Sequence, residues 1–186
     1  MTAAATETAI PGYEAATWNI DPIHSEVGFS VRHMMVSKVR GRFTDFSGQI
    51  VTADDPTQSS VTAEIQLASI NTGQDQRDEH IRSADFFEVE TYPTMTYKTT
   101  SIRVEDGEYV LDGDLTLKGV TKRVPLRLEL NGFGPDAYGG VRAGFTATGE
   151  INRRDFNVNF NAPLANGGAV VADKVTLHLE IEAVKA

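Results

Sequence analysis

Apolar and polar residues alternate with a period of two along five stretches of this chain. Successive side chains of a strand point to opposite faces, so each apolar row predicts the buried face of one strand. The rows are Val27, Phe29 and Val31; Val61, Ala63, Ile65 and Leu67; Val124, Leu126, Leu128 and Leu130; Ala143, Phe145, Ala147, Gly149 and Ile151; and Val175, Leu177, Leu179, Ile181 and Ala183. These strands must cover one another's faces, as in a sandwich or a closed barrel.

Turn signals divide the chain into eight or nine strands with mostly short connections, which predicts an antiparallel sheet. The clearest hairpin signal is Asp106-Gly107, between expected strands over 94–104 and 109–117. Apolar positions change parity along the first of these strands, and a bulge near Thr99-Thr100 would reconcile them. Because the alternating rows leave exposed apolar faces in any open arrangement, we predict an all-β protein with a closed antiparallel barrel.

Residues 72–88 depart from the strand pattern. Asp75 is a candidate N-cap for a short helix over 76–82, and Asp78 would then lie in its first turn. The sequence therefore predicts a short helical insert between strands, which would serve as a lid or plug at one end of the barrel.

The length of 186 residues suits one domain. Residues 1–16 are small and polar and are expected to form a disordered or loosely attached tail, followed by a barrel domain over 17–186. The tail lacks the basic and apolar regions of a signal peptide, and no run approaches the ~20 apolar residues of a membrane span. We therefore expect a soluble, cytoplasmic protein with no transmembrane segment.

The composition excludes several classes of function. The chain has 17 Lys and Arg against 26 Asp and Glu, a formal charge of −9, which disfavours binding to nucleic acid. It has no cysteine, which rules out disulfides, thiolate metal sites and a cysteine nucleophile.

Several short motifs follow one another from about residue 17 to the end of the chain. They are Trp18–Ser25, Val27–Met34, Gly41–Phe43, Phe46–Gly48, Ala68–Thr72, Arg77–Ile81, Ser83–Phe87, Tyr92-Pro93, Gly113–Lys122 and Ile151–Phe156. In their order and content they resemble the YceI-like family of lipocalin-like, polyisoprenoid-binding proteins, which often has glycine where Asn157 stands. The resemblance implies an elongated eight-stranded barrel, an isoprenoid or similar amphiphile in a long apolar tunnel, and commonly a homodimer.

The candidate ligand site is the inward wall of this tunnel. The pattern alone favours a packed core for the interior aromatic residues, and the resemblance reverses this preference toward a tunnel. His33 shares the parity of Val31 and should face inward, where it would bind a ligand head group or hydrogen-bond within the core. Arg153 and Arg154 offer a basic site. The predicted ligand-binding residues are Phe29, Val31, His33, Phe43, Ile65, Ile70, Phe86, Phe87, Met95, Tyr97, Leu115, Leu117, Phe145, Arg154 and Phe156.

A cluster formed by Arg77, Asp78 and His80 falls within one turn of the expected helix. It would either hold the insert on the barrel through an ion network or form a polar mouth that meets a phosphate or quinone head group.

Catalytic and metal-binding patterns are weak. His24 and Ser25 are adjacent on an extended chain and face opposite ways, so we expect them to fix the turn at Asp21-Pro22. None of the histidines His24, His33, His80 and His178 has the spacing of a metal motif. We predict no metal, no cofactor apart from a bound lipid, and no enzymatic activity. The lipid could be a polyprenyl phosphate, an isoprenoid quinone or a fatty acid or amide. The alternatives are an isomerase or hydrolase using the same cavity, or a stress-response structural barrel.

Overall fold

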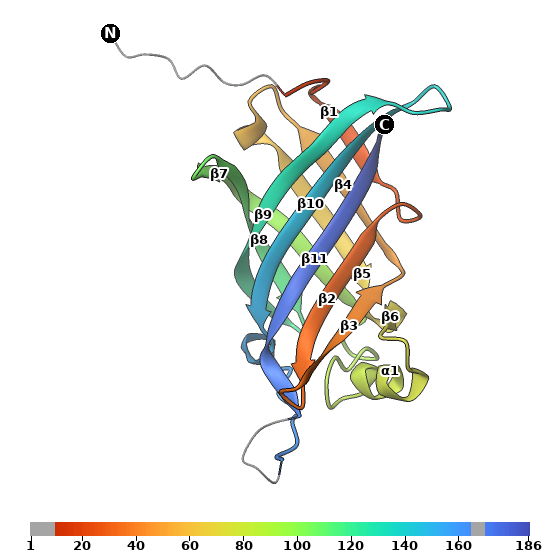
Figure 1. Ribbon diagram of the computed structural model, residues 1–186, viewed down its shortest axis with the longest axis vertical. Helices are drawn as coiled ribbons and strands as arrows, with labels where there is room; N and C mark the ends of the chain where they lie inside the picture. Colours follow the sequence, from red (N-terminus) through yellow and green to blue (C-terminus); the bar gives the residue numbers. More distant parts are fainter. Residues whose placement is uncertain (1–9, 165–169) are drawn as a thin grey trace.

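The computed structural model describes residues 10–164 and 170–186, and in these residues an antiparallel sheet closes on itself (Figure 1). Its strands are β1 (Ala16–Ile20), β2 (Glu26–His33), β3 (Ser37–Phe43), β4 (Phe46–Thr52), β5 (Ser60–Gln66), β6 (Ile70–Asn71), β7 (Thr94–Glu105), β8 (Glu108–Leu117), β9 (Val120–Pro135), β10 (Val141–Asn152) and β11 (Val171–Lys185). Helical segments are α1 (Asp75–Arg82) and the short 3₁₀ turns Pro56–Gln58, Leu67–Ser69 and Arg153–Phe156.

The sheet closes through β11, which pairs with β10 on one side and with both β1 and β2 on the other. Ala183 of β11 lies opposite Ile20 of β1, and Leu177 lies opposite Phe29 of β2. Strands β1 and β2 are therefore two halves of one broken strand, and the pairs β3–β4 and β5–β6 are broken in the same way. The result confirms the eight-stranded antiparallel barrel.

The break between β1 and β2 is fixed by the polar residues that the sequence assigned to it. Asp21 Oδ1 accepts a hydrogen bond from the amide of Ile23 at 2.9 Å, and Asp21 Oδ2 lies 2.7 Å from Nδ1 of His24. Ser25 Oγ donates to the carbonyl of Glu182 at 3.1 Å and accepts from its amide at 3.0 Å. The two Ser25 bonds satisfy the backbone groups of Glu182 in β11, where the neighbouring strand is interrupted.

The two ends of the barrel differ (Figure 1). The end that we call upper carries the β7–β8 and β9–β10 turns and the first described residues, whereas the lower end carries α1, the β2–β3 hairpin and the segment between β10 and β11. Tyr13 crosses the upper end, where its hydroxyl donates to the carbonyl of Ala53 at 2.5 Å and its ring meets Phe133 edge to face at 5.3 Å. Tyr13 thus contacts the barrel, and residues 1–9 of the expected tail lie outside the described residues.

The expected hairpin and bulge are both present. Asp106 and Gly107 have φ values of 53° and 79°, the left-handed conformation that a two-residue hairpin turn requires. The β7–β8 ladder shifts register between Thr99 and Ser101, where the parity of the apolar positions changes. The helix differs by one residue: Gln74, not Asp75, caps it by accepting the amide of Arg77 at 2.6 Å. None of the described helices is long and apolar enough to span a membrane.

Candidate functional site

A cavity of about 460 Å³ lies inside the barrel. Its wall is formed by the inward rows of the strands, for example Leu115 of β8, Leu126 of β9, Ala147 of β10 and Leu177 of β11, and it is almost wholly apolar. Ligand sites of proteins have volumes of roughly 300–1,000 Å³, so the cavity is large enough for a small molecule or a lipid chain.

An aromatic row crosses the cavity wall from β2 to the insert after α1. The ring of Phe29 lies on Gly41 of β3, where an added Cβ would be 2.4 Å from Cζ of the ring. Phe43 lies next in the row, with its ring centroid 5.7 Å from that of Phe29 and 6.2 Å from that of Phe87. The bare backbone at Gly41 thus lets an aromatic ring from the neighbouring strand lie flush in the wall.

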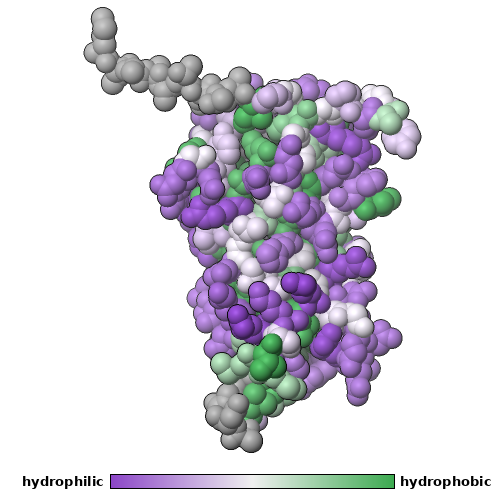
Figure 2. Space-filling model, viewed as in Figure 1, coloured by the Kyte–Doolittle hydropathy of each residue, from purple (hydrophilic) through white to green (hydrophobic). Residues whose placement is uncertain are grey.

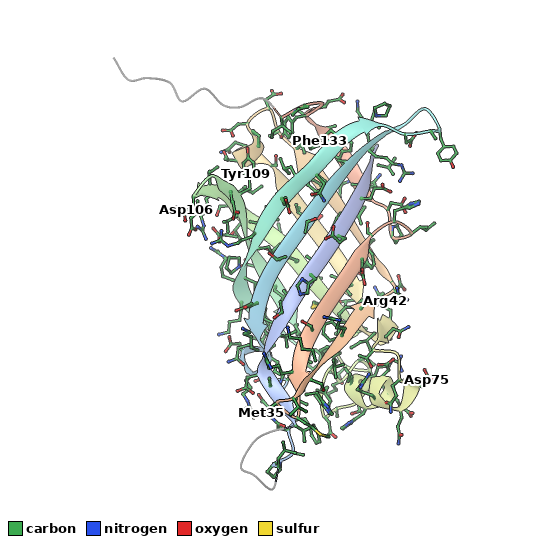
Figure 3. The ribbon with its side chains drawn as sticks, viewed as in Figure 1. Met35, Arg42, Asp75, Asp106, Tyr109 and Phe133 are labelled. Atoms are coloured by element: carbon green, nitrogen blue, oxygen red, sulfur yellow. The ribbon has the colours of Figure 1, made fainter. Side chains whose placement is uncertain are left out.

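Aromatic side chains fill the upper end of the barrel. Trp18 is fully buried, and its Nε1 donates to Oγ1 of Thr52 at 2.9 Å. The ring of Phe133, labelled in Figure 3, packs edge to face at 5.6 Å from Trp18 and at 5.8 Å from Phe145, which lines the cavity. A ligand chain that reached this end would meet apolar rings.

Ionisable side chains gather at the lower end of the cavity, where His33, Arg77 and His80 line it and the exposed Arg32 lies at its rim. We call this its charged end. His33 faces inward and is half-buried, as its parity predicts, and among the described residues no hydrogen bond or ion pair engages its imidazole. An inward imidazole that keeps its hydrogen-bonding capacity suits a polar group of a ligand.

The insert is held on the barrel by a polar network. Arg77 donates from Nε to Oγ1 of Thr72 and from Nη2 to the carbonyl of Thr72, both at 2.8 Å. Asp78 is buried, and its carboxylate accepts hydrogen bonds from the amide of Thr72 at 3.0 Å and from the Thr72 hydroxyl at 2.5 Å. The Asp78 carboxylate thus anchors α1 to the end of β6, while Arg77 both joins the anchor and borders the cavity.

His80 joins the insert to the segment before β11. Its Nε2 lies 2.8 Å from Oδ2 of Asp85, and its ring is edge to face with Phe86 at 5.1 Å and with Phe160 at 4.9 Å. Phe86 and Phe160 also line the cavity, so this cluster forms part of its lower boundary.

Two predicted ligand residues do not line the cavity. Arg154 is exposed and donates to Oδ1 of Asp173 at 2.7 Å, and Phe156 is buried at 1% exposure away from the cavity wall. The 3₁₀ turn directs Arg153 inward instead, and Asn157 ends this turn in the left-handed conformation, φ 59°, which glycine adopts most readily.

The guanidinium of Arg153 holds the segment between β10 and β11. Its Nη1 donates to the carbonyls of Val158 at 2.7 Å and Phe160 at 2.8 Å, and its Nε donates to that of Ala172 at 2.9 Å. Burial, together with the nearby charge of Arg154, lowers the pKa of Arg153. Because its donors are directed at backbone carbonyls, Arg153 shapes the charged end rather than offering a free binding group.

The other predicted ligand residues all line the cavity: Phe29, Val31, His33, Phe43, Ile65, Ile70, Phe86, Phe87, Met95, Tyr97, Leu115, Leu117 and Phe145. Their contact with a ligand stays a prediction. Sequence reasoning missed Tyr13 and Phe160, which also line the cavity. Both lie outside the alternating stretches, so no periodic signal could have assigned them to the interior.

Two carboxylates and a histidine converge on the outside of the barrel. The atoms of Asp21, His24 and Glu182 that could coordinate a metal ion lie within 4.8 Å of one another. The Nη1 atom of Arg142 lies 2.8 Å from Oδ2 of Asp21 and 2.9 Å from Oε2 of Glu182. The guanidinium of Arg142 thus pairs with both carboxylates, and the arrangement is an ion network. Hydrogen bonds from Arg142 and then His24 hold the pKa of Asp21 well below its usual range.

Known proteins resemble this chain in sequence and in fold. Protein YceI of Escherichia coli O6:H1 is 41% identical over 147 residues, covering 77% of either chain. The crystal structure of BcnA from Burkholderia cenocepacia superposes with a TM-score of 0.71 at 25% identity, covering 88% of this chain and 98% of that one. A polyisoprenoid-binding domain from Saccharophagus degradans, implicated in plant cell wall breakdown, shares the fold with a TM-score of 0.66 at 19% identity, covering 93% of this chain and all of that one. The model of the YceI-like domain matches residues 18–183, and the chain therefore belongs to the YceI-like family.

Proposed function

We propose that the protein binds an isoprenoid lipid or a similar long-chain amphiphile in the barrel cavity and stores or carries it through water. The observation that carries this proposal is the closed barrel with an apolar cavity of about 460 Å³. Transfer of an alkyl chain from water into such an apolar cavity lowers the free energy by about 0.8 kcal/mol per CH₂. The polyisoprenoid-binding domain of the same fold from Saccharophagus degradans supports this class of ligand.

The ligand would lie with its chain toward the aromatic upper end and its head group at the charged end. Arg77 donates to Thr72 through Nε and Nη2, so these two bonds do not use its Nη1 atom. A guanidinium pairs strongly with phosphate or carboxylate oxygens, and the imidazole of His33 would add a hydrogen bond. A polyprenyl phosphate, a quinone or a fatty acid would each satisfy this arrangement.

An isomerase or hydrolase using the same cavity is the second candidate, and it requires an acid and a base that converge on the ligand. Two carboxylates of the insert that could serve, Asp78 and Asp85, are bonded to Thr72 and to His80. We therefore favour binding over catalysis. A stress-response barrel without a ligand is the third candidate.

Solvent extraction distinguishes the three candidates. The protein is purified without detergent, extracted with an organic solvent, and the extract is analysed by mass spectrometry. We expect one amphiphile per chain, unchanged after prolonged incubation with the protein. Conversion of the amphiphile to a product would favour an enzyme. An empty protein that also takes up no added prenyl lipid would overturn the proposed function.

A further inference from the structure

The tip of the β2–β3 hairpin exposes apolar side chains at backbone positions that disfavour them. Met34 and Met35 have φ values of 52° and 61°, and the amide of Val36 donates to the carbonyl of His33 at 3.3 Å to close the turn. Turns with two left-handed central residues favour Asn and Gly, because a side chain crowds the backbone there. Met35 and Val36 are nevertheless 66% and 85% exposed. Neither folding nor hydration favours these residues at this tip, which indicates a role in contact with another surface.

Cations line the outer face of the same hairpin. Arg32 lies opposite Lys38 in the ladder, Arg40 lies opposite Ser30, and Arg42 lies opposite Gly28. All four cationic side chains are exposed, and within the described residues no hydrogen bond or ion pair engages them. By contrast, four arginines elsewhere on the barrel are paired with carboxylates: Arg103 with Asp112, Arg123 with Asp114, Arg127 with Glu108 and Arg154 with Asp173.

Other charged groups near this face leave it cationic. Glu26 and Glu180 lie beside Arg42, at the part of the hairpin farthest from the tip. Glu150 is paired with Lys174 of β11. The acidic residues of α1 belong to the insert on the far side of β3. The hairpin side of the lower end is therefore positively charged, although the formal charge of the chain is −9.

The tip lies beside the charged end of the cavity. Val31 and His33, the last inward residues of β2, line the cavity immediately before the turn begins. Figure 3 places Met35 near the lower end and Arg42 higher on the hairpin, and Figure 2 shows hydrophobic surface at the same end below a mostly hydrophilic wall. A surface bound at the tip would therefore lie beside the charged end of the cavity.

We propose that the β2–β3 hairpin docks the protein on an anionic lipid bilayer, with Met34, Met35 and Val36 in the head-group region and Arg32, Lys38, Arg40 and Arg42 against anionic head groups. An apolar edge flanked by cations is the pattern that binds such surfaces. A second copy of the chain fits less well, because a two-fold contact would bring the same cations face to face. Docking rests on the proposed function in one respect: it gives a lipid in the bilayer a path to the cavity.

The electrostatic part is tested by co-sedimentation with vesicles of pure phosphatidylcholine and of phosphatidylcholine mixed equally with phosphatidylglycerol. We expect binding only to the anionic vesicles, and its loss at high salt. A cation near an anionic surface contributes about five-fold to partitioning, so Arg40→Gln should weaken binding by about that factor. Lys98→Gln is the matched control, because Lys98 is exposed on β7 across the barrel. Equal effects of both variants, or no binding of the parent protein, would overturn the proposal.

The apolar part is tested with Met35→Asn, since Asn adopts the left-handed conformation more readily than Met and preserves the turn. We expect it to bind anionic vesicles more weakly, whereas Tyr138→Asn, at a 90% exposed residue of the β9–β10 turn, should bind as the parent does. Self-association that depends on Met35 in light scattering, without vesicle binding, would overturn the proposal.

Uptake of a prenyl alcohol from a cyclodextrin complex tests the cavity without vesicles. Failure of this uptake alongside intact vesicle binding would overturn the proposed function but support docking.

Discussion

The ring of Tyr97 on β7 lies so close to Gly113 on β8 that a Cβ added at Gly113 would be 2.3 Å from Cζ of the ring. The hydroxyl of Tyr97 donates to the carbonyl of Val124 on β9 at 2.9 Å. One side chain thus spans three strands and forms part of the cavity wall. Burial of the phenol raises the pKa of Tyr97, so the hydroxyl keeps its proton and remains a donor at every physiological pH.

Gly113→Ala should therefore distort the wall, because the added methyl group displaces the Tyr97 ring and weakens its hydrogen bond. We expect the free energy of unfolding to fall by about 1–3 kcal/mol, the usual cost of overpacking. Gly134→Ala is the control, since a Cβ there meets no atom within 4 Å. Denaturant titration of both variants gives the comparison, and equal stability of the two would contradict the close contact.

Ala147→Phe tests whether the barrel interior is a ligand cavity or a packed core. Ala147 lines the cavity from the middle of β10, and a phenyl ring there would occupy the space of a ligand chain. We expect lipid retention to fall at least ten-fold while the ligand-free protein keeps its thermal stability. Ala137→Phe, at an exposed residue of the β9–β10 turn, should retain lipid. Strong destabilisation of the ligand-free Ala147→Phe variant would indicate a packed core.

Arg77→Gln tests the head-group role of the charged end. Glutamine can still hydrogen-bond to Thr72, so we expect the fold to persist while affinity for anionic amphiphiles falls about ten-fold or more, as for a lost charge-assisted bond. Affinity for a neutral prenyl alcohol should change little. Arg82→Gln is the control on the same helix, because Arg82 donates to the carbonyls of Ala68 and Ile70. If both variants lose anionic and neutral ligands alike, Arg77 has only a structural role.

The Asp21–Arg142 pair should make stability depend on acid. The pKa of Asp21 is depressed in the folded protein, so its carboxylate stabilises the fold above the unfolded value of 3.8, and this contribution disappears as the pH falls toward the folded value. We expect Asp21→Asn to be less stable than the parent at pH 7, with the difference shrinking below about pH 5. Thermal unfolding measured across this range is the test, with Asp54→Asn on an exposed loop as control. A difference that stays constant with pH would argue against the pair.

The strands could be predicted because their burial follows the alternation of single residues. Phe145 and Ala147 face inward and Thr146 outward, as the period of two requires. The alternation also predicted that the sheet closes, but it could not give the strand pairs that close it, because β11 divides its hydrogen bonds between β1 and β2, which are far from it in the sequence. The homodimer implied by the resemblance stays a prediction, which light scattering would test.

The site was predictable where it lies on strands and less so at the lower end. Two adjacent arginines give no signal of which one turns inward, and the phase of a single 3₁₀ turn buries Arg153 and exposes Arg154. Met34 and Met35 adopt left-handed conformations that their own propensities oppose. Such positions are where reasoning from local preference fails, and here they coincide with the proposed docking surface.

The most direct test of the central claim is the affinity of the delipidated protein for a series of alcohols of increasing chain length. If the chain lies in the apolar cavity, each added CH₂ should raise affinity by about four-fold, equivalent to about 0.8 kcal/mol, until the cavity is full and affinity levels off. Ala147→Phe should move this plateau to shorter chains. Affinity that does not depend on chain length, or a plateau that Ala147→Phe leaves in place, would contradict a lipid-binding barrel.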